Sequence, residues 1–333
     1  MMKKANSKKT TGRTAEGVLA GERRALARAI TLIESTRQDH RNEADALLEQ
    51  ILPHSGQSIR IGISGVPGVG KSTFIEAFGM HLIQQGHRVA VLAIDPSSQR
   101  TGGSILGDKT RMELLSRQQA AFIRPSPAGK TLGGVARRTR EAMLLCEAAG
   151  FDVILVETVG VGQSETAVSE MVDMFLLLLL PGGGDELQGI KKGIMELADM
   201  VVVNKADGDL IPAANRAAVE YHAALGLMRP SSPNWKPAVK KCSALQDEGI
   251  DEIWEAICSF RHKLWASGEI PQKRAQQAKA WMWNEIRETL LVAFRDDQQV
   301  AAALQEMESD VIEGRLAPAS AANRLLNLFL KSS

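Results

Sequence analysis

The feature that most constrains this chain is a glycine-rich segment, Gly65-Val-Pro-Gly-Val-Gly-Lys-Ser72, which is followed by Thr73. It matches the phosphate-binding pattern G-x-x-x-x-G-K-[ST] at every fixed position. Residues 59–64 are apolar and β-branched, which predicts a buried strand, and residues 72–85 predict a helix. A turn between a strand and a helix N-terminus directs backbone N–H groups at one point. The segment therefore predicts a phosphate site, with a chance glycine-rich turn as the alternative.

The residues of this P-loop have separate expected roles. Glycine allows positive φ and a close approach of the backbone to phosphate oxygens. Lys71 is expected to reach the β- and γ-phosphates as a catalytic residue, and the Ser72 hydroxyl is expected to bind Mg²⁺. The whole loop is predicted to bind a nucleotide through Gly65, Val66, Pro67, Gly68, Val69, Gly70, Lys71, Ser72 and Thr73.

Composition excludes several other kinds of partner. The 40 basic and 39 acidic residues nearly cancel, so nothing favours nucleic-acid binding. The three cysteines are widely spaced, which favours reduced thiols and a cytoplasmic location. The longest apolar run, residues 174–180, is far shorter than the roughly 20 residues of a membrane span. We expect no membrane segment, and we interpret the run as a central parallel strand covered on both faces.

A second motif, Asn204-Lys-Ala-Asp207, follows an apolar predicted strand and matches the guanine-reading element of GTPases. A carboxylate at Asp207 can accept hydrogen bonds from guanine N1–H and the exocyclic amine. Adenine offers neither group there, so a buried carboxylate would be left unsatisfied. A further base-contacting loop is expected directly after the last predicted strand. The guanine site is predicted to comprise Asn204, Lys205, Asp207, Ser243, Ala244 and Leu245, with GTP or GDP and Mg²⁺ bound.

Three acids are candidate Mg²⁺ ligands besides Ser72. Glu157 ends a predicted strand and Gly160 follows three residues later, as in the γ-phosphate sensor of switch GTPases. Asp95 ends the second predicted strand, at the edge where such sheets bind ligands, and is a candidate Mg²⁺ ligand or catalytic water-orienting base; the alternative is a turn cap before Pro96. Asp108 lies in a glycine-rich segment that we interpret as a mobile switch loop; the alternative is a helix N-cap.

Two features predict slow hydrolysis that depends on a partner. Val161 stands where Ras-like proteins place the glutamine that orients water, and Gln163 is shifted by two positions. Residues 182–193 begin with three glycines, which have no packing value, so we expect this loop to move. Its lysines, Lys191 and Lys192, can meet phosphate or a partner, with a solvated helix face as the alternative.

Strands and helices are predicted to alternate through the middle of the chain, which indicates an α/β P-loop NTPase fold, a G domain with a mostly parallel sheet. The strands are predicted at 59–64, 88–94, 121–125, 152–157, 174–180, 199–204 and 237–242. Uncovered helical stripes outside that domain predict a homodimer interface. The domains are a disordered tail at 1–14, a helical arm at 15–54, a P-loop GTPase domain at 55–268 and a C-terminal helical dimerisation extension at 269–333.

Together with the P-loop, the segments Asp95-Pro-Ser-Ser98, Glu157-Thr-Val-Gly-Val-Gly-Gln-Ser-Glu165 and Asn204-Lys-x-Asp207 carry a family resemblance. The chain resembles the GTPases that chaperone methylmalonyl-CoA mutase. These include bacterial proteins formerly called arginine/ornithine transport kinases and the human methylmalonic aciduria cblA-type protein. Residues 101–112 and 183–193 also look like family signatures, and the resemblance runs from about residue 16 to the C-terminal helices.

The resemblance implies a homodimer that uses GTP hydrolysis to gate adenosylcobalamin delivery to the mutase and to protect that enzyme. It implies that Asp95, Asp108 and Glu157 serve the Mg²⁺ and switch machinery. It also implies a third switch at residues 182–193, in which Gln188 and Lys191 respond to the mutase. Adenosylcobalamin is expected only on the partner, because the chain has no cobalamin-binding Asp-x-His-x-x-Gly pattern.

Two other functions compete with this interpretation. Nickel-inserting GTPases share the Glu-x-x-Gly variant, but they use Cys and His ligands or His-rich tails that this chain does not offer. A P-loop kinase would use ATP and would have no need of the guanine reader at residues 204–207. Methylmalonyl-CoA mutase and isobutyryl-CoA mutase are equally compatible with the sequence as partners.

Overall fold

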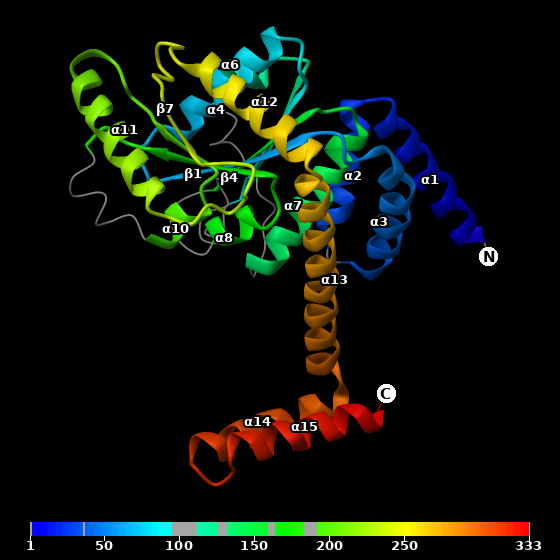
Figure 1. Cartoon of the computed structure of the whole chain (residues 1–333). Helices are drawn as coiled ribbons and strands as arrows, with labels where there is room; N and C mark the ends of the chain where they lie inside the picture. The colour runs from blue at the N-terminus through cyan, green and yellow to red at the C-terminus, as the bar shows by residue number, and fades with distance from the viewer. Residues whose placement is uncertain are drawn as a thin grey trace. The chain divides into compact units, whose positions relative to one another are not determined.

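The computed structural model describes residues 2–35, 37–94, 112–125, 132–158, 164–182 and 192–332. The chain divides into two compact units, Met1–Arg274 and Ala275–Ser333. Figure 1 shows the elements of both. Among the described residues, no helix is long and apolar enough to cross a membrane.

In the described part of the first unit, seven parallel strands form one sheet in the order β3-β2-β4-β1-β5-β6-β7. The strands are β1 Ile59–Gly65, β2 Val89–Ile94, β3 Ala121–Arg124, β4 Val153–Thr158, β5 Met174–Leu179, β6 Met200–Val203 and β7 Ala238–Lys241. Each lies where the sequence predicts it. The predicted fold class, an α/β P-loop domain with a mostly parallel sheet, is confirmed.

The central strands are apolar along their whole length because helices cover both faces of the sheet. Every residue of β1, β4 and β5 is buried. Successive residues of β5 alternate between the faces: Leu176 and Leu178 join the core under α4 and α12, and Leu177 and Leu179 join the core under α11. The apolar run at 174–180 is therefore a strand with two buried faces, as predicted.

The helices of the first unit alternate with these strands along the chain and surround the sheet (Figure 1). Their bounds are α4 Lys71–Gln84, α6 Glu113–Ser116, α7 Leu132–Ala148, α8 Ser164–Ser169, α10 Lys192–Leu197, α11 Ile211–Gly226 and α12 Ile250–Ala266, with a short 3₁₀ helix η2 at Gly208–Leu210. Because all strands are parallel, their carboxyl ends meet at one edge of the sheet, and the P-loop lies at that edge.

The N-terminal segment forms three helices, α1 Met2–Leu19, α2 Arg23–Glu34 and α3 Gln38–Ile51, and the 3₁₀ helix η1 Leu52–His54. They pack against one another and against α7. The apolar stripe of α2 is buried there, at Leu26, Ile30 and Ile33. Residues 2–14 of the lysine-rich stretch, for which the sequence predicts a disordered tail, are drawn as part of α1.

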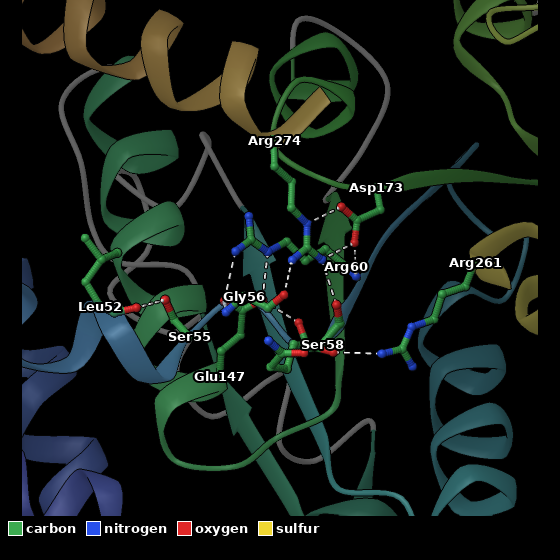
Figure 2. A network of polar contacts seen from close by, with 10 residues as sticks. Leu52, Ser55, Gly56, Ser58, Arg60, Glu147, Asp173, Arg261 and Arg274 are labelled. Carbon is green, nitrogen blue, oxygen red and sulfur yellow. Dashed lines mark hydrogen bonds and ion pairs between the residues drawn. The ribbon is translucent and has the colours of Figure 1, made fainter. Parts of the chain in front are cut away.

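Four charged side chains lie at the amino ends of β1 and β5 (Figure 2); three are buried, and that of Arg274 is 13% exposed. Arg60 donates two hydrogen bonds to Glu147, from Nε at 2.9 Å and Nη2 at 2.8 Å. Arg274 donates to Asp173 from Nε at 2.8 Å and Nη2 at 2.6 Å, and its guanidinium also donates to the carbonyl oxygens of Gly56 and Ser58. Two arginines and two acids make the cluster neutral, which offsets the cost of burying charge.

Helix α13, Glu269–Asp296, begins in the first unit and continues into the second. The second unit also contains α14 Gln298–Ile312 and α15 Pro318–Ser332, which pack together, and the rings of Phe294 and Phe329 lie edge to face with centroids 5.6 Å apart. Many large apolar side chains of this unit are exposed on the single chain: Met282, Trp283, Ile286, Leu290, Leu291, Val292, Ile312, Leu326 and Leu330.

Candidate nucleotide-binding site

The P-loop leaves β1 at Gly65 and enters α4 at Lys71. Two glycines are required by their surroundings. A Cβ on Gly65 would lie 2.5 Å from the carbonyl oxygen of Leu178 on the neighbouring strand. Gly70 has φ 90°, and a Cβ there would lie 2.9 Å from Nδ2 of Asn204. The sequence thus builds a tight loop that presses against β5 and against the predicted guanine-reading segment.

The ammonium of Lys71 lies over this loop. Its Nζ donates to the carbonyl oxygen of Gly65 at 2.7 Å and to that of Val66 at 3.4 Å. Burial lowers the pKa of Lys71 below its ordinary value, and the nearby carboxylates of Glu157 and Glu165 partly offset that effect. The N-terminus of α4 and this ammonium together favour an anion at the loop, as the motif predicts.

Asn204 ties the guanine-reading segment to the P-loop and to the loop after β7. Its Nδ2 donates to the carbonyl oxygen of Val69 at 2.8 Å, and its Oδ1 accepts from the backbone N–H of Ala244 at 3.2 Å. Lys205 reaches the same P-loop, where its Nζ donates to the carbonyl oxygen of Gly68 at 2.8 Å. Segments separated by more than a hundred residues in sequence therefore form one site.

Asp207 is held by the second base-contacting loop. The hydroxyl of Ser243 donates to Oδ2 of Asp207 at 2.5 Å, which orients the carboxylate. Leu245, two residues further on, is 80% exposed. An oriented carboxylate between two loops is the arrangement that reading guanine N1–H and its exocyclic amine requires.

The metal ligands predicted from the sequence are described in part. The hydroxyl of Ser72 donates to Oε1 of the buried Glu157 at 3.4 Å. A hydroxyl and a carboxylate are oxygen donors that suit Mg²⁺, so the two described residues fit the ion. No cluster of three or more His, Cys, Asp or Glu side chains occurs in the described part of the chain. The other predicted switch, catalytic and metal residues lie outside the described residues: Asp95, Asp108, Gly160, Gln188 and Lys191.

Comparison with known proteins decides the family. The family model described as "Methylmalonyl Co-A mutase-associated GTPase MeaB" matches residues 26–299. The chain belongs to the MeaB family. This confirms the resemblance carried by the P-loop, the Glu157 segment and the Asn204 segment. A MeaB-family chain with a P-loop domain of this kind is a GTPase, and its fold is that of a nucleotide-binding protein.

Individual relatives agree with this family. The mouse protein named "Methylmalonic aciduria type A homolog, mitochondrial" is 53% identical, over 94% of this chain and 78% of its own length. The Escherichia coli protein named "GTPase ArgK" is 55% identical, over 81% of this chain and 82% of its own. A crystal structure described as an LAO/AO transport system kinase is 42% identical with a TM-score of 0.76, covering 96% of this chain and 98% of that one.

Sequence reasoning missed three side chains at this MeaB-family site. The thiol of Cys242 donates to Oδ1 of Asn204 at 3.4 Å, so it supports the residue that joins the loops. The hydroxyl of Thr158 donates to the hydroxyl of Ser64 at 2.9 Å, at the carboxyl ends of β4 and β1. In the sequence, each of these residues is marked only by its position next to a motif. Their contacts could not be predicted because they depend on how the strands are aligned.

Proposed function

We propose that this MeaB-family GTPase uses GTP hydrolysis to gate adenosylcobalamin loading of a cobalamin-dependent acyl-CoA mutase, methylmalonyl-CoA mutase, and to protect that enzyme. One observation carries the proposal: the P-loop and the Asn204-Lys-x-Asp207 segment are joined in a chain whose family description names this mutase. The name of the mouse relative refers to methylmalonic aciduria, which agrees with a role connected to this mutase. We place this activity in the cytoplasm.

The chain's own residues would divide the work as follows. Lys71 and the P-loop hold the phosphates, and Asp207 with Ser243 reads the guanine base. Ser72 and Glu157 would hold Mg²⁺ with Asp95 and Asp108. The ion neutralises charge on the phosphates when it is bound. Gly160 would sense the γ-phosphate, and Gln188 and Lys191 would respond to the mutase. Adenosylcobalamin would stay on the partner.

Hydrolysis by the protein alone would be slow. The described site supplies a phosphate-binding ammonium, a base reader and metal ligands, and Val161 stands where a water-orienting glutamine is found in Ras-like proteins. A partner that rearranges residues 182–193 would complete the site. The rate of GTP hydrolysis would then depend on whether the mutase is bound.

The protein would act as a homodimer. In the Ala275–Ser333 unit, α13, α14 and α15 expose large apolar side chains on the single chain, and such patches are covered by a partner in most proteins. We assign residues 269–333 to dimerisation, 15–54 to a helical arm and 55–268 to the GTPase domain. Light scattering of full-length protein should give twice the mass of one chain, and a monomer would contradict this assignment.

The mutase role is tested by loading apo-mutase with adenosylcobalamin. With GTP, the mutase in complex with this protein should accept only the intact cofactor, and a non-hydrolysable GTP analogue should block loading. Lys71→Ala, which lacks the phosphate-binding ammonium, should behave as the analogue does. Loading that is indifferent to the nucleotide would reject the proposal. Tighter binding of ATP than of GTP would instead favour a kinase.

A further inference from the structure

The carboxyl ends of β1 and β4 are joined by two buried hydroxyl groups. Oγ1 of Thr158 donates to Oγ of Ser64 at 2.9 Å, and the two residues are 0% and 1% exposed. Ser64 is the last residue before Gly65, where the P-loop begins, and Thr158 directly follows Glu157. Oγ1 of Thr158 also lies 3.5 Å from the carbonyl oxygen of Ile63, its second and longer contact with β1. The Thr158 hydroxyl therefore connects the base of the P-loop to the residue after the predicted Mg²⁺ carboxylate.

Strand register puts this pair at a junction. In the parallel ladder Ile63 of β1 pairs with Glu157 of β4, and Thr158 pairs on its other side with Ile94 of β2. Ile94 is the residue before Asp95. Thr158 thus lies between the strand that leads into the P-loop and the strand that leads to a second predicted metal ligand. A shift of Thr158 would therefore change the position of β4 relative to both β1 and β2.

The geometry of the metal donors depends on this junction. Glu157 comes from β4 and Ser72 from α4, and the distance from Ser72 Oγ to Glu157 Oε1 is 3.4 Å. The two oxygens must keep a fixed spacing to share one Mg²⁺ ion, since this ion demands near-ideal geometry. A hydrogen bond has a set length and direction, so a hydroxyl pair fixes neighbouring strand ends more closely than apolar contact does.

We propose that the Ser64–Thr158 hydroxyl pair is a positioning element that sets the affinity of the nucleotide site for Mg²⁺. Both residues act through Glu157 and the P-loop and touch neither ion nor nucleotide. The inference rests on the Mg²⁺–GTP site proposed above and is independent of the mutase partner. It adds two positioning residues, at the ends of β1 and β4, to the predicted Mg²⁺ ligands.

The test is Mg²⁺-dependent retention of a fluorescent GDP by the full-length protein. Thr158→Val removes the donor with little change in shape. It should raise the Mg²⁺ concentration for half-maximal retention about fivefold, as expected for the loss of one buried hydrogen bond. GDP affinity in EDTA should not change. Thr158→Ser should restore the wild-type Mg²⁺ response, because it keeps the hydroxyl.

The acceptor gives an independent variant. Ser64→Ala removes the 2.9 Å bond and leaves the longer contact of Thr158 with the carbonyl oxygen of Ile63, so it should raise the Mg²⁺ requirement in the same direction as Thr158→Val. The double variant should be no worse than Thr158→Val, since that change already removes the shared bond. Thr139→Val is the matched control. Thr139 is a buried threonine whose hydroxyl donates to the carbonyl oxygen of Val135 at 2.9 Å within α7, so its hydrogen bond does not join two strands. Its Mg²⁺ response should equal that of wild type.

The outcomes separate the two levels of the proposal. An unchanged Mg²⁺ response in both Thr158→Val and Ser64→Ala would overturn the positioning role while leaving the metal site in place. Equal loss of GDP affinity with and without Mg²⁺ would also overturn it, because the pair would then be supporting the P-loop alone. Wild-type GDP release that ignores Mg²⁺ would overturn the proposed metal site and the inference with it.

Discussion

Replacing Asn204 with alanine should weaken the P-loop and the guanine site together. The Asn204 side chain is buried, its Nδ2 donates to the carbonyl oxygen of Val69, and its Oδ1 accepts from the N–H of Ala244. Val69 and Ala244 are themselves buried, so the substitution leaves one acceptor and one donor without this partner, in addition to the weak thiol donor of Cys242. Each such group costs about 1–3 kcal/mol, which gives a loss of about 2–6 kcal/mol in the free energy of unfolding.

The assay separates stability from binding. Urea unfolding without nucleotide should show this loss. We expect a value in the lower half of the range, because without nucleotide water can hydrogen-bond to the groups that lose Asn204. Calorimetry should show that GTP and GDP affinities fall together by at least about tenfold, since 1.4 kcal/mol is a factor of ten. Asn215→Ala is the control: Asn215 is exposed and accepts from Lys241 at 2.5 Å, so its loss should cost less than about 0.5 kcal/mol.

Two results would refute the reasoning. A loss of GTP affinity with GDP affinity intact would place Asn204 at the γ-phosphate, away from the base. Unchanged stability and unchanged affinity would mean that the bonds to Val69 and Ala244 do not hold the loops together.

Three further substitutions have direct outcomes. Lys71→Ala should abolish GTP hydrolysis with an unchanged circular dichroism spectrum, because it removes a charge from the phosphate site; unchanged turnover would count against that role. Asp207→Asn should weaken GTP binding and relax base choice in competition assays with other nucleotides, whereas intact guanine preference would exclude it as the base reader. Glu147→Gln should lower the free energy of unfolding by about 3–5 kcal/mol in denaturant titrations, because Arg60 stays buried without its charged partner; a loss below about 1 kcal/mol would show that water compensates.

The fold could be predicted from local patterns. Each buried parallel strand is a short apolar run, and the helices between them carry one apolar stripe, so element type and order follow from the sequence. The P-loop and the Asn204 segment are also local signatures whose positions after strands place them at one sheet edge.

The parts that escaped prediction are contacts between distant segments. Glu147 and Arg60 are 87 residues apart, and Asp173 and Arg274 are 101 residues apart. Charged residues are mostly exposed, so nothing in the residue types indicated a cluster of four charges, three of them buried. The bond from Thr158 depends on the register of β4 against β1, which a run of apolar residues does not specify by itself.

GTP turnover in the presence of purified mutase tests the central claim most directly. Turnover by the protein alone should be slow, and methylmalonyl-CoA mutase should raise it at least about tenfold, because Val161 stands where Ras-like proteins place the water-orienting glutamine and the partner is expected to complete the site. Isobutyryl-CoA mutase, measured side by side, shows which acyl-CoA mutase is served. Fast turnover by the isolated protein, or turnover that neither mutase changes at saturating concentration, would contradict a partner-gated GTPase.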